Sequence, residues 1–166
     1  MKLGIYGGTF NPPHLGHLTS ARAAMDVLEL DHLQFVPAAL PPHKTLPEGS
    51  PSPQERLEMV ELAADSLLLP DRIGVNDLEL SRPGKSYTAD TLEQIHEKYP
   101  EAELWLMMGT DMFLTLHNWW DPERITRLAG VCTFARTQSD SLEALDRQAE
   151  YLRDTFGART RVLRLP

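Results

Sequence analysis

Two histidines, His14 and His17, carry the clearest chemical signal in the chain. They follow a short apolar run (residues 3–6) and two glycines, and they precede apolar residues at helical spacing (residues 18–28), so they lie where a buried strand turns into a helix. Because they are three residues apart, the two imidazoles share one face of that helix. The start of a helix carries roughly half a unit of positive charge. These residue types at this place predict a polyphosphate-binding site.

The segment between the strand and the helix fits the same chemistry. Gly7 and Gly8 allow the backbone to turn sharply and leave its N–H groups uncovered. Pro12 and Pro13 stiffen the approach, and a proline at the first helical position loses no needed hydrogen bond. No Gly-Lys-Ser/Thr follows, which excludes a Walker A loop, and the dinucleotide spacing G-x-G-x-x-G is absent. The alternative is that the histidines are packed and have a structural role. Two histidines at one helix start do not favour this alternative.

Composition and charge define the class of protein. At 166 residues, with 42% hydrophobic and 24% charged residues, the chain suits one globular domain with one sizeable core. No secretory leader is present and no apolar run reaches the length of about 18 residues that a membrane helix needs, so we expect a cytoplasmic protein. Cys132 lies in an apolar run, which places it in the core and fits a reducing compartment. A net charge of −8 argues against nucleic-acid or membrane partners, but not against a small polyanionic substrate.

Short apolar runs alternate with amphipathic helices along the whole chain. The expected strands are residues 3–6, 33–36, 72–75, 104–108, 131–134 and 161–165. After the third of these, apolar alternation continues through Leu78 and Leu80. This pattern predicts an α/β fold in one domain over residues 1–166, with a doubly wound, Rossmann-like parallel sheet covered by helices on both faces. Ligands of such sheets bind beyond the carboxyl ends of the strands, where the histidine turn lies.

Residues 7–17 resemble the G-G-T-F-[DN]-P-x-H-x-G-H segment of the nucleotidyltransferases whose H-x-G-H motif binds a nucleoside triphosphate. Within that superfamily the chain is most similar to bacterial nicotinate-nucleotide adenylyltransferases, a match that also depends on later segments. The resemblance implies that His14 and His17 are the catalytic residues. It implies that ATP is contacted in this turn by Gly8, Thr9, Phe10, His14 and His17.

A long polar loop at residues 38–51 follows the second strand, and a loop of that length in a compact domain is usually functional or mobile. One interpretation is a stiff solvated loop with an exposed lysine. The other follows from its resemblance to the family's P-P-H-K, which implies that Lys44 contacts both ATP and nicotinate mononucleotide. A capping box at residues 52–55 begins the next helix. Arg56 lies in its first turn, where a cation is unfavourable; pairing with a carboxylate, support of the phosphate loop and surface exposure all stay open.

Residues 84–92 lead from a glycine into another amphipathic helix. Ser86 or Thr88 would cap this helix, and free amides at its start suit a carboxylate or phosphate. Residues 86–92 resemble the S-Y-T-x-[DQ]-T-[LV] segment of nicotinate-nucleotide adenylyltransferases, which the related phosphopantetheine adenylyltransferases lack. The resemblance implies a nicotinate mononucleotide pocket at Ser86, Tyr87 and Thr88, with backbone amides facing the nicotinate carboxylate.

Further candidate residues follow the two strands near the C-terminus. Gly109 and Asp111 come after the most apolar strand; Asp111 as a helix cap is one interpretation, and similarity to the family's G-[ATQ]-D implies ATP binding by both. Of the adjacent Trp119 and Trp120, we expect one in the core and one as a stacking platform. Trp119 matches the tryptophan that stacks on the nicotinate ring in the family. Arg136 follows the next strand and suits a phosphate in fork geometry, although only the first residue of the family's R-P matches.

The family resemblance implies adenylyl transfer from ATP to nicotinate mononucleotide, giving deamido-NAD and pyrophosphate. The substrate phosphate is the nucleophile, so catalysis rests on alignment and on stabilising charge at phosphoryl oxygens. Mg²⁺ arrives on ATP, and no clustered carboxylates predict a dedicated metal site. The alternatives are another nucleotidyltransferase (phosphopantetheine adenylyltransferase or cytidylyltransferase type), a non-catalytic nucleotide-binding module and, least favoured, a structural domain. Preference for nicotinate over nicotinamide mononucleotide stays open, as does a homo-oligomeric state.

The end of the chain departs from the family pattern. The family continues with an I-S-S-T-x-I-R motif whose hydroxyls and arginine complete the triphosphate site, and nothing in this sequence matches it. Either the sequence is truncated at its C-terminus or the activity is impaired, and the residues do not decide between the two.

Overall fold

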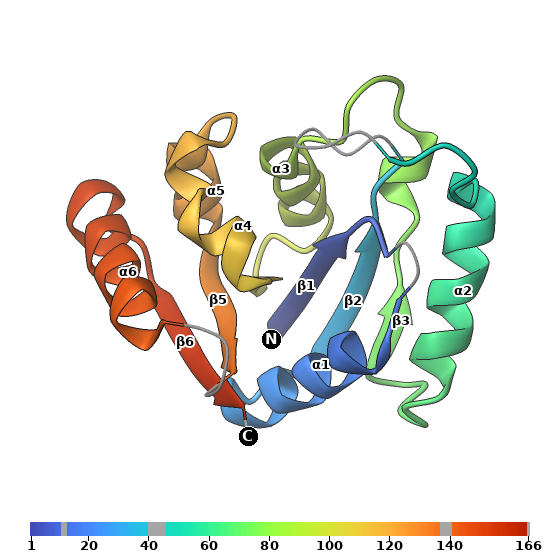
Figure 1. Cartoon of the computed structure of the whole chain (residues 1–166), viewed down its shortest axis with the longest axis horizontal. Coiled ribbons are helices and arrows are strands. Elements are labelled where there is room, and N and C mark those ends of the chain that lie inside the picture. The colour runs from blue at the N-terminus through green and yellow to red at the C-terminus, as the bar shows by residue number, and fades with distance from the viewer. Residues whose placement is uncertain (11–12, 40–45, 137–140, 166) are drawn as a thin grey trace.

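The computed structural model describes residues 1–10, 13–39, 46–136 and 141–165. In this part of the chain six strands form one parallel sheet in the order β3-β2-β1-β4-β5-β6 (Figure 1). The strands are β1 (Lys2–Gly8), β2 (His32–Pro37), β3 (Ile73–Val75), β4 (Glu103–Met108), β5 (Ala129–Arg136) and β6 (Thr160–Leu165). Each coincides with an apolar run that predicted it, so the Rossmann-like single domain is confirmed.

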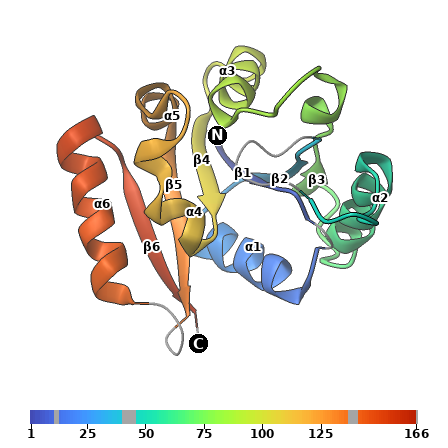
Figure 2. The same cartoon turned by 45° about the horizontal axis from the view of Figure 1, so that its top comes forward.

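Helices cover both faces of this sheet (Figures 1 and 2). They are α1 (Leu15–Val27), α2 (Pro53–Asp65), α3 (Thr88–Lys98), α4 (Thr110–Leu114), α5 (Pro122–Leu128) and α6 (Leu142–Phe156), with short 3₁₀ turns η1 (Leu78–Ser81) and η2 (Leu116–Asn118). Helices α1 and α2 pack on one face, and α3 to α6 pack on the other. None of the described helices has the length and apolarity needed to cross a membrane.

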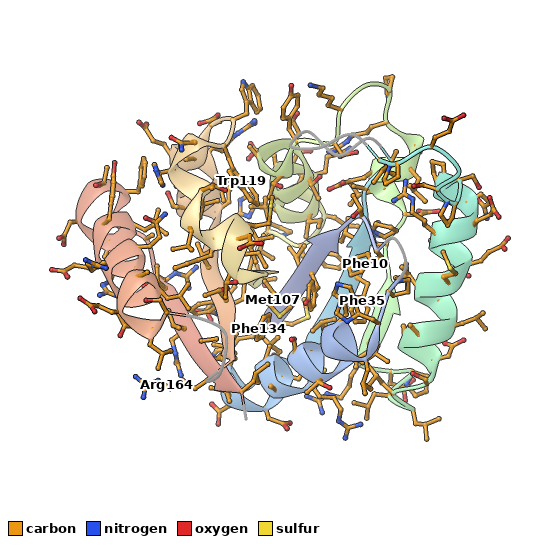
Figure 3. The ribbon with its side chains drawn as sticks, viewed as in Figure 1. Phe10, Phe35, Met107, Trp119, Phe134 and Arg164 are labelled. Atoms are coloured by element: carbon orange, nitrogen blue, oxygen red, sulfur yellow. The ribbon has the colours of Figure 1, made fainter. Side chains whose placement is uncertain are left out.

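Alternate residues of the central strands fill two separate cores. In β4, Leu106 contributes to the core under α3 to α6, whereas Met107 contributes to the core under α1 and α2. Figure 3 shows Met107 near Phe35 and Phe134 in the α1 layer. Burial on both faces explains why these strands are apolar along their length and not only at every second residue. Cys132 lies in the same layer, fully buried, as predicted.

The apolar alternation through Leu78 and Leu80 does not extend the third strand. Strand β3 ends at Val75, and the next residues form η1. Asn76 causes the change of direction: its N–H donates to the Phe35 carbonyl at 2.8 Å, while its side-chain oxygen accepts the N–H of Leu78 at 3.0 Å. Such a local side chain-to-backbone bond competes with the strand ladder.

The order of the strands creates a switch point between β1 and β4. The chain runs from β1 outward to β2 and β3 on one side, then returns to β4 and runs outward on the other. The register pairs Tyr6 with Met107, which places Gly8 and Gly109, two residues further along each chain, at the same edge of the sheet. A crevice at this edge is where open α/β sheets bind their ligands.

Candidate active site

The two histidines form the start of α1 themselves. His14 is the N-cap, and its Nδ1 accepts the backbone N–H of Gly16 at 3.0 Å. In return the Nδ1 of His17 accepts the backbone N–H of His14 at 3.0 Å. This is the reciprocal arrangement of a capping box, built here from imidazoles in place of a hydroxyl and a carboxylate. The predicted helix start with both histidines on one face is confirmed.

This cap determines the tautomer of each ring. Because Nδ1 of His14 and of His17 accepts an N–H, each neutral ring carries its proton on Nε2. The rings stack with their centroids 3.8 Å apart, so the two imidazoles lie together at the positive end of α1. His17 also packs edge-on against Phe10 and Tyr6, at 5.0 and 5.9 Å between centroids, which restrains its rotation.

The sharp turn after β1 does not come from the glycines, as the sequence suggested. Gly7 and Gly8 still belong to β1, and the left-handed backbone angle occurs at Phe10, with φ 49°. The Phe10 ring is 3% exposed and packs in the α1 core, so this residue can reach a ligand only through its backbone. Packing around the buried ring therefore holds a conformation that phenylalanine seldom adopts.

The second candidate segment follows β4. Gly109 is the N-cap of α4, in extended conformation, and a Cβ built on it meets nothing within 4 Å. Neither backbone angle nor packing therefore requires glycine here. Asp111 lies in the first turn of α4, exposed to solvent, and that helix has no side-chain cap hydrogen bond, so the interpretation of Asp111 as a cap is wrong. Both residues stand at the carboxyl edge of the sheet, beside the β1 turn.

The expected caps of α3 are also wrong. Its N-cap is Tyr87, which makes no side-chain cap hydrogen bond. Thr88 is already the first helical residue, and Ser86 is turned inward with only 4% of its surface exposed. Among the described residues, no side-chain cap thus closes the start of α3, which suits an anionic group.

A buried carboxylate, Glu79, lies near Ser86 and was not predicted from the sequence. Glu79 is 6% exposed and accepts the hydroxyl of Thr91 at 2.5 Å. Desolvation raises the pKa of Glu79 to about 7, although Thr91, Arg82 and, weakly, the nearby Ser86 hydroxyl favour the ionised form. The Ser86 hydroxyl oxygen is buried and makes no hydrogen bond with the described residues. Glu79, Arg82 and Thr91 together hold the segment that precedes α3.

The two tryptophans divide as predicted into a packed and an exposed one. Trp119 is partly buried against the α3-to-α6 core, and its Nε1 donates to the Thr115 hydroxyl at 3.3 Å (Figure 3). Trp120 is 52% exposed; its ring lies 5.2 Å from that of Tyr87 and 5.2 Å from the guanidinium carbon of Arg124. The tryptophan matched to the nicotinate platform, Trp119, is therefore the more deeply packed of the pair.

Arg56 lies inside the protein and not on its surface. It is 0% exposed, and its guanidinium donates to the carbonyls of Thr9, Ala38 and Ala39. Of the interpretations left open by the sequence, support of the loop beside the histidines is the one the structure selects. The unfavourable position of a cation in a first helical turn was the sequence signal for such a role.

Two predicted residues lie partly or wholly beyond the described structure. Lys44 falls outside the described residues. The backbone of Arg136 ends β5, while its side chain is not among those described. Among the described residues, no group of three or more His, Cys, Asp or Glu side chains is arranged to hold a metal ion.

One known protein family matches most of this chain. A family model described as cytidylyltransferase-like matches residues 5–156. The chain belongs to the cytidylyltransferase-like family. Relatives of the chain are named as probable nicotinate-nucleotide adenylyltransferases, which confirms the resemblance to that group.

Two relatives show the extent of the match. The protein from Geobacter sulfurreducens is 41% identical over 146 residues, which are 87% of this chain and 65% of that one. The protein from Carboxydothermus hydrogenoformans is 36% identical over 165 residues, which are 99% of this chain and 79% of that one. The match to the first thus spans slightly less than two thirds of that relative's length.

A solved structure agrees on the fold. Plasmodium falciparum nicotinic acid mononucleotide adenylyltransferase complexed with NaAD superposes with a TM-score of 0.78 over 99% of this chain and 75% of that one, at 19% identity. At this identity the likeness establishes the Rossmann-like architecture and leaves the roles of single residues to the geometry.

Proposed function

We propose that this protein transfers the adenylyl group of ATP to nicotinate mononucleotide, giving deamido-NAD and pyrophosphate as a step of NAD biosynthesis. The observation that carries the proposal is the imidazole cap of α1, in which the Nδ1 atoms of His14 and His17 hold the helix start, so that each neutral ring carries its N–H on Nε2, beside the switch point. The names of the relatives support the choice of acceptor. The buried Cys132 thiol suits a cytoplasmic enzyme.

The reaction needs no nucleophile from the protein. An oxygen of the mononucleotide's 5′-phosphate attacks the α-phosphorus of ATP, the bond from that phosphorus to the bridging oxygen of the β-phosphate breaks, and pyrophosphate leaves with the bridging oxygen. Negative charge builds up on the phosphoryl oxygens during this exchange. Donors that are already oriented stabilise that charge without reorganising. His17 faces the α-phosphate in this proposal, and His14 faces the neighbouring phosphates.

The rest of the ATP site lies along the carboxyl edge of β1 and β4. Backbone groups of residues 8–10 follow the phosphates, and Gly109 with Asp111 meets the adenosine side. Gly109 suits this position because its Cβ side is open and a ligand can approach the backbone. Lys44 offsets charge on the leaving pyrophosphate. Mg²⁺ enters as part of the substrate, bound to the triphosphate.

The acceptor site lies around the start of α3. The amides of Tyr87 and Thr88, which have no side-chain cap, receive the nicotinate carboxylate. The Trp119 ring stacks on the electron-poor pyridine ring. Ser86 is buried near Glu79 and supports the backbone of this segment from inside the protein. Arg136 binds the phosphate of the mononucleotide in fork geometry. A carboxylate-binding helix start favours the nicotinate form over the nicotinamide form, which carries no such charge.

One assay tests this proposal. Pyrophosphate release from Mg·ATP is measured with nicotinate mononucleotide, nicotinamide mononucleotide and phosphopantetheine as acceptors. We expect the highest kcat/KM with nicotinate mononucleotide. Faster release with phosphopantetheine would assign the chain to another nucleotidyltransferase. ATP binding by calorimetry without release for any acceptor would leave only a nucleotide-binding module.

A further inference from the structure

The buried guanidinium of Arg56 joins two segments that the chain separates widely. Its Nη1 donates to the Thr9 carbonyl at 2.7 Å and to the Ala38 carbonyl at 2.6 Å, and its Nη2 donates to the Ala39 carbonyl at 3.1 Å. Thr9 belongs to the turn between β1 and α1 that leads to the histidines. Ala38 and Ala39 follow β2 and begin the loop that leads to Lys44. One side chain therefore fixes both backbone segments beside the proposed phosphate site.

Arg56 is itself held by a rigid support. It lies in the first turn of α2, where Ser52 accepts the N–H of Glu55 at 3.1 Å and Glu55 accepts the N–H of Ser52 at 3.0 Å. The backbone N–H of Arg56 bonds to the Ser52 carbonyl at 2.9 Å. A closed capping box keeps this turn from fraying. The helix thus fixes the position of the guanidinium, and the guanidinium in turn fixes the carbonyls of the two loops.

The charge of Arg56 is not neutralised by a carboxylate in the described part of the chain, where it forms no ion pair. Its Nε has no hydrogen-bond partner there either. Burial lowers the pKa of Arg56, yet a guanidinium stays protonated in proteins. A buried charge without a counter-ion is unfavourable for folding. A buried guanidinium beside the proposed anion-binding turn has a function if it holds the backbone of that turn in place.

Peptide geometry shows what the three bonds do. In a trans peptide the C=O and the following N–H point in opposite directions. With the Thr9 carbonyl held by Arg56, the N–H of Phe10 points away from the guanidinium. With the Ala38 carbonyl held in the same way, the N–H of Ala39 also points away from it. The arginine therefore orients backbone donors on both loops and adds a positive charge behind them.

We propose that Arg56 is a positioning residue for phosphoryl chemistry, which holds the histidine turn and the start of the 38–51 loop in one arrangement so that their amides face the triphosphate of ATP. The inference rests on the proposed adenylyl transfer. It assigns Arg56 no contact with substrate. A lysine at this place would keep the charge but lack the fork that reaches three carbonyls.

The test compares Arg56→Lys and Arg56→Ala with the wild-type chain by steady-state kinetics of pyrophosphate release. We expect kcat/KM for ATP to fall by about 10–100-fold in both variants, as expected for a small misplacement of the reacting groups. KM for nicotinate mononucleotide should change by less than about threefold, because the start of α3 is not held by this arginine. Guanidinium chloride, far below unfolding concentrations, should restore part of the activity of Arg56→Ala and none of Arg56→Lys, whose side chain occupies the space.

The matched control is Arg72→Lys. Arg72 also donates to backbone carbonyls, those of Leu30 and Asp31, but near the amino ends of the strands. We expect its kinetics to stay at the wild-type level. A loss in Arg72→Lys equal to that in Arg56→Lys, or wild-type kinetics in Arg56→Lys, would overturn the inference.

Two measurements keep this test decisive. Where thermal melts show that the Arg56 variants do not fold, Ser52→Ala takes their place, because it loosens the turn that carries Arg56 without removing the arginine; wild-type kcat/KM for ATP in that variant would contradict the inference. Calorimetric titration with a non-hydrolysable ATP analogue separates the two proposals. If the wild-type chain releases no pyrophosphate, adenylyl transfer fails, and equal affinity of wild type and Arg56→Lys for the analogue would then reject the positioning role as well.

Discussion

At the scale of single residues, the imidazoles of His14 and His17 have two separable tasks. Each Nδ1 accepts a backbone N–H and so builds the helix start, and in the proposed mechanism each Nε2–H donates to a phosphate. An asparagine side chain places an oxygen close to where Nδ1 lies, but it does not reach as far as Nε2. Substitution can therefore remove the donor and keep the cap.

His17→Asn should lower kcat by about 10²–10³, the usual loss when one preorganised donor is removed. Because the asparagine oxygen can still accept the N–H of His14, the melting temperature should change little. Steady-state pyrophosphate release and a thermal melt measure the two effects. His32→Asn, at an exposed position near the amino end of β2, is the control. A change in kcat of less than threefold would remove His17 from the mechanism.

The two tryptophans allow a second residue-scale prediction. Trp119→Ala should weaken binding of nicotinate mononucleotide by roughly 1–3 kcal/mol, the range known for bases stacked on aromatic side chains. Affinity for ATP should stay the same. Titration calorimetry of Trp119→Ala and Trp120→Ala shows which of the two rings stacks on the nicotinate, since Trp120 is the more exposed ring. A larger loss of affinity in Trp120→Ala would assign the stacking role to Trp120.

At the scale of elements, helix starts and strand ends converge on one edge of the sheet. The starts of α1 and α4 follow the adjacent strands β1 and β4; the first turn of α1 carries no acidic residue, and that of α4 carries Asp111, which makes no cap hydrogen bond. Fixed N–H dipoles at the start of α1 therefore favour anions. Gly109 between β4 and α4 is the position at which this arrangement can be tested without disturbing the core.

Gly109→Ala should leave the free energy of unfolding within about 0.5 kcal/mol of wild type, because the backbone is extended and the Cβ side is open. The added methyl group would nevertheless lie where ATP approaches, and KM for ATP should rise about tenfold, equivalent to ~1.4 kcal/mol. Denaturant unfolding and kinetics measure the two quantities. Gly74→Ala in β3, whose Cβ side is equally open, should change neither. Unchanged KM in Gly109→Ala would show that ligand and glycine do not meet.

At the scale of the whole molecule, the parallel sheet was predictable because burial on both faces leaves continuous apolar runs such as residues 104–108. The position of the candidate site was predictable where residue type and spacing coincide, because His14 and His17 stand at the helix start where the sequence placed them. Local backbone angles and the burial of charged side chains were not predictable. The left-handed angle lies at Phe10 and not at a glycine, and packing around its ring helps to hold it there. Arg56 and Glu79 are charged residues whose burial depends on segments distant in sequence, and such contacts leave no periodic pattern.

Glu79 makes the stability of the molecule depend on pH. Its pKa rises from an ordinary 4.5 to about 7 in the folded protein, mainly through desolvation. An unfolded chain therefore loses this proton first, and the folded state becomes relatively less stable as pH increases from about 4.5 through about 7. A glutamine at this position has no proton to lose and can still accept the Thr91 hydroxyl.

The free energy of unfolding of Glu79→Gln, relative to wild type, should hence increase between pH 4.5 and 7.5 by about 3 kcal/mol, since each unit of pKa shift corresponds to ~1.4 kcal/mol. Urea unfolding at a series of pH values measures the difference. Glu97→Gln, which removes an exposed carboxylate of α3, controls for net charge and should run parallel to wild type. A difference that stays constant over this range would mean that the pKa of Glu79 is not raised, with Thr91 and Arg82 offsetting its burial.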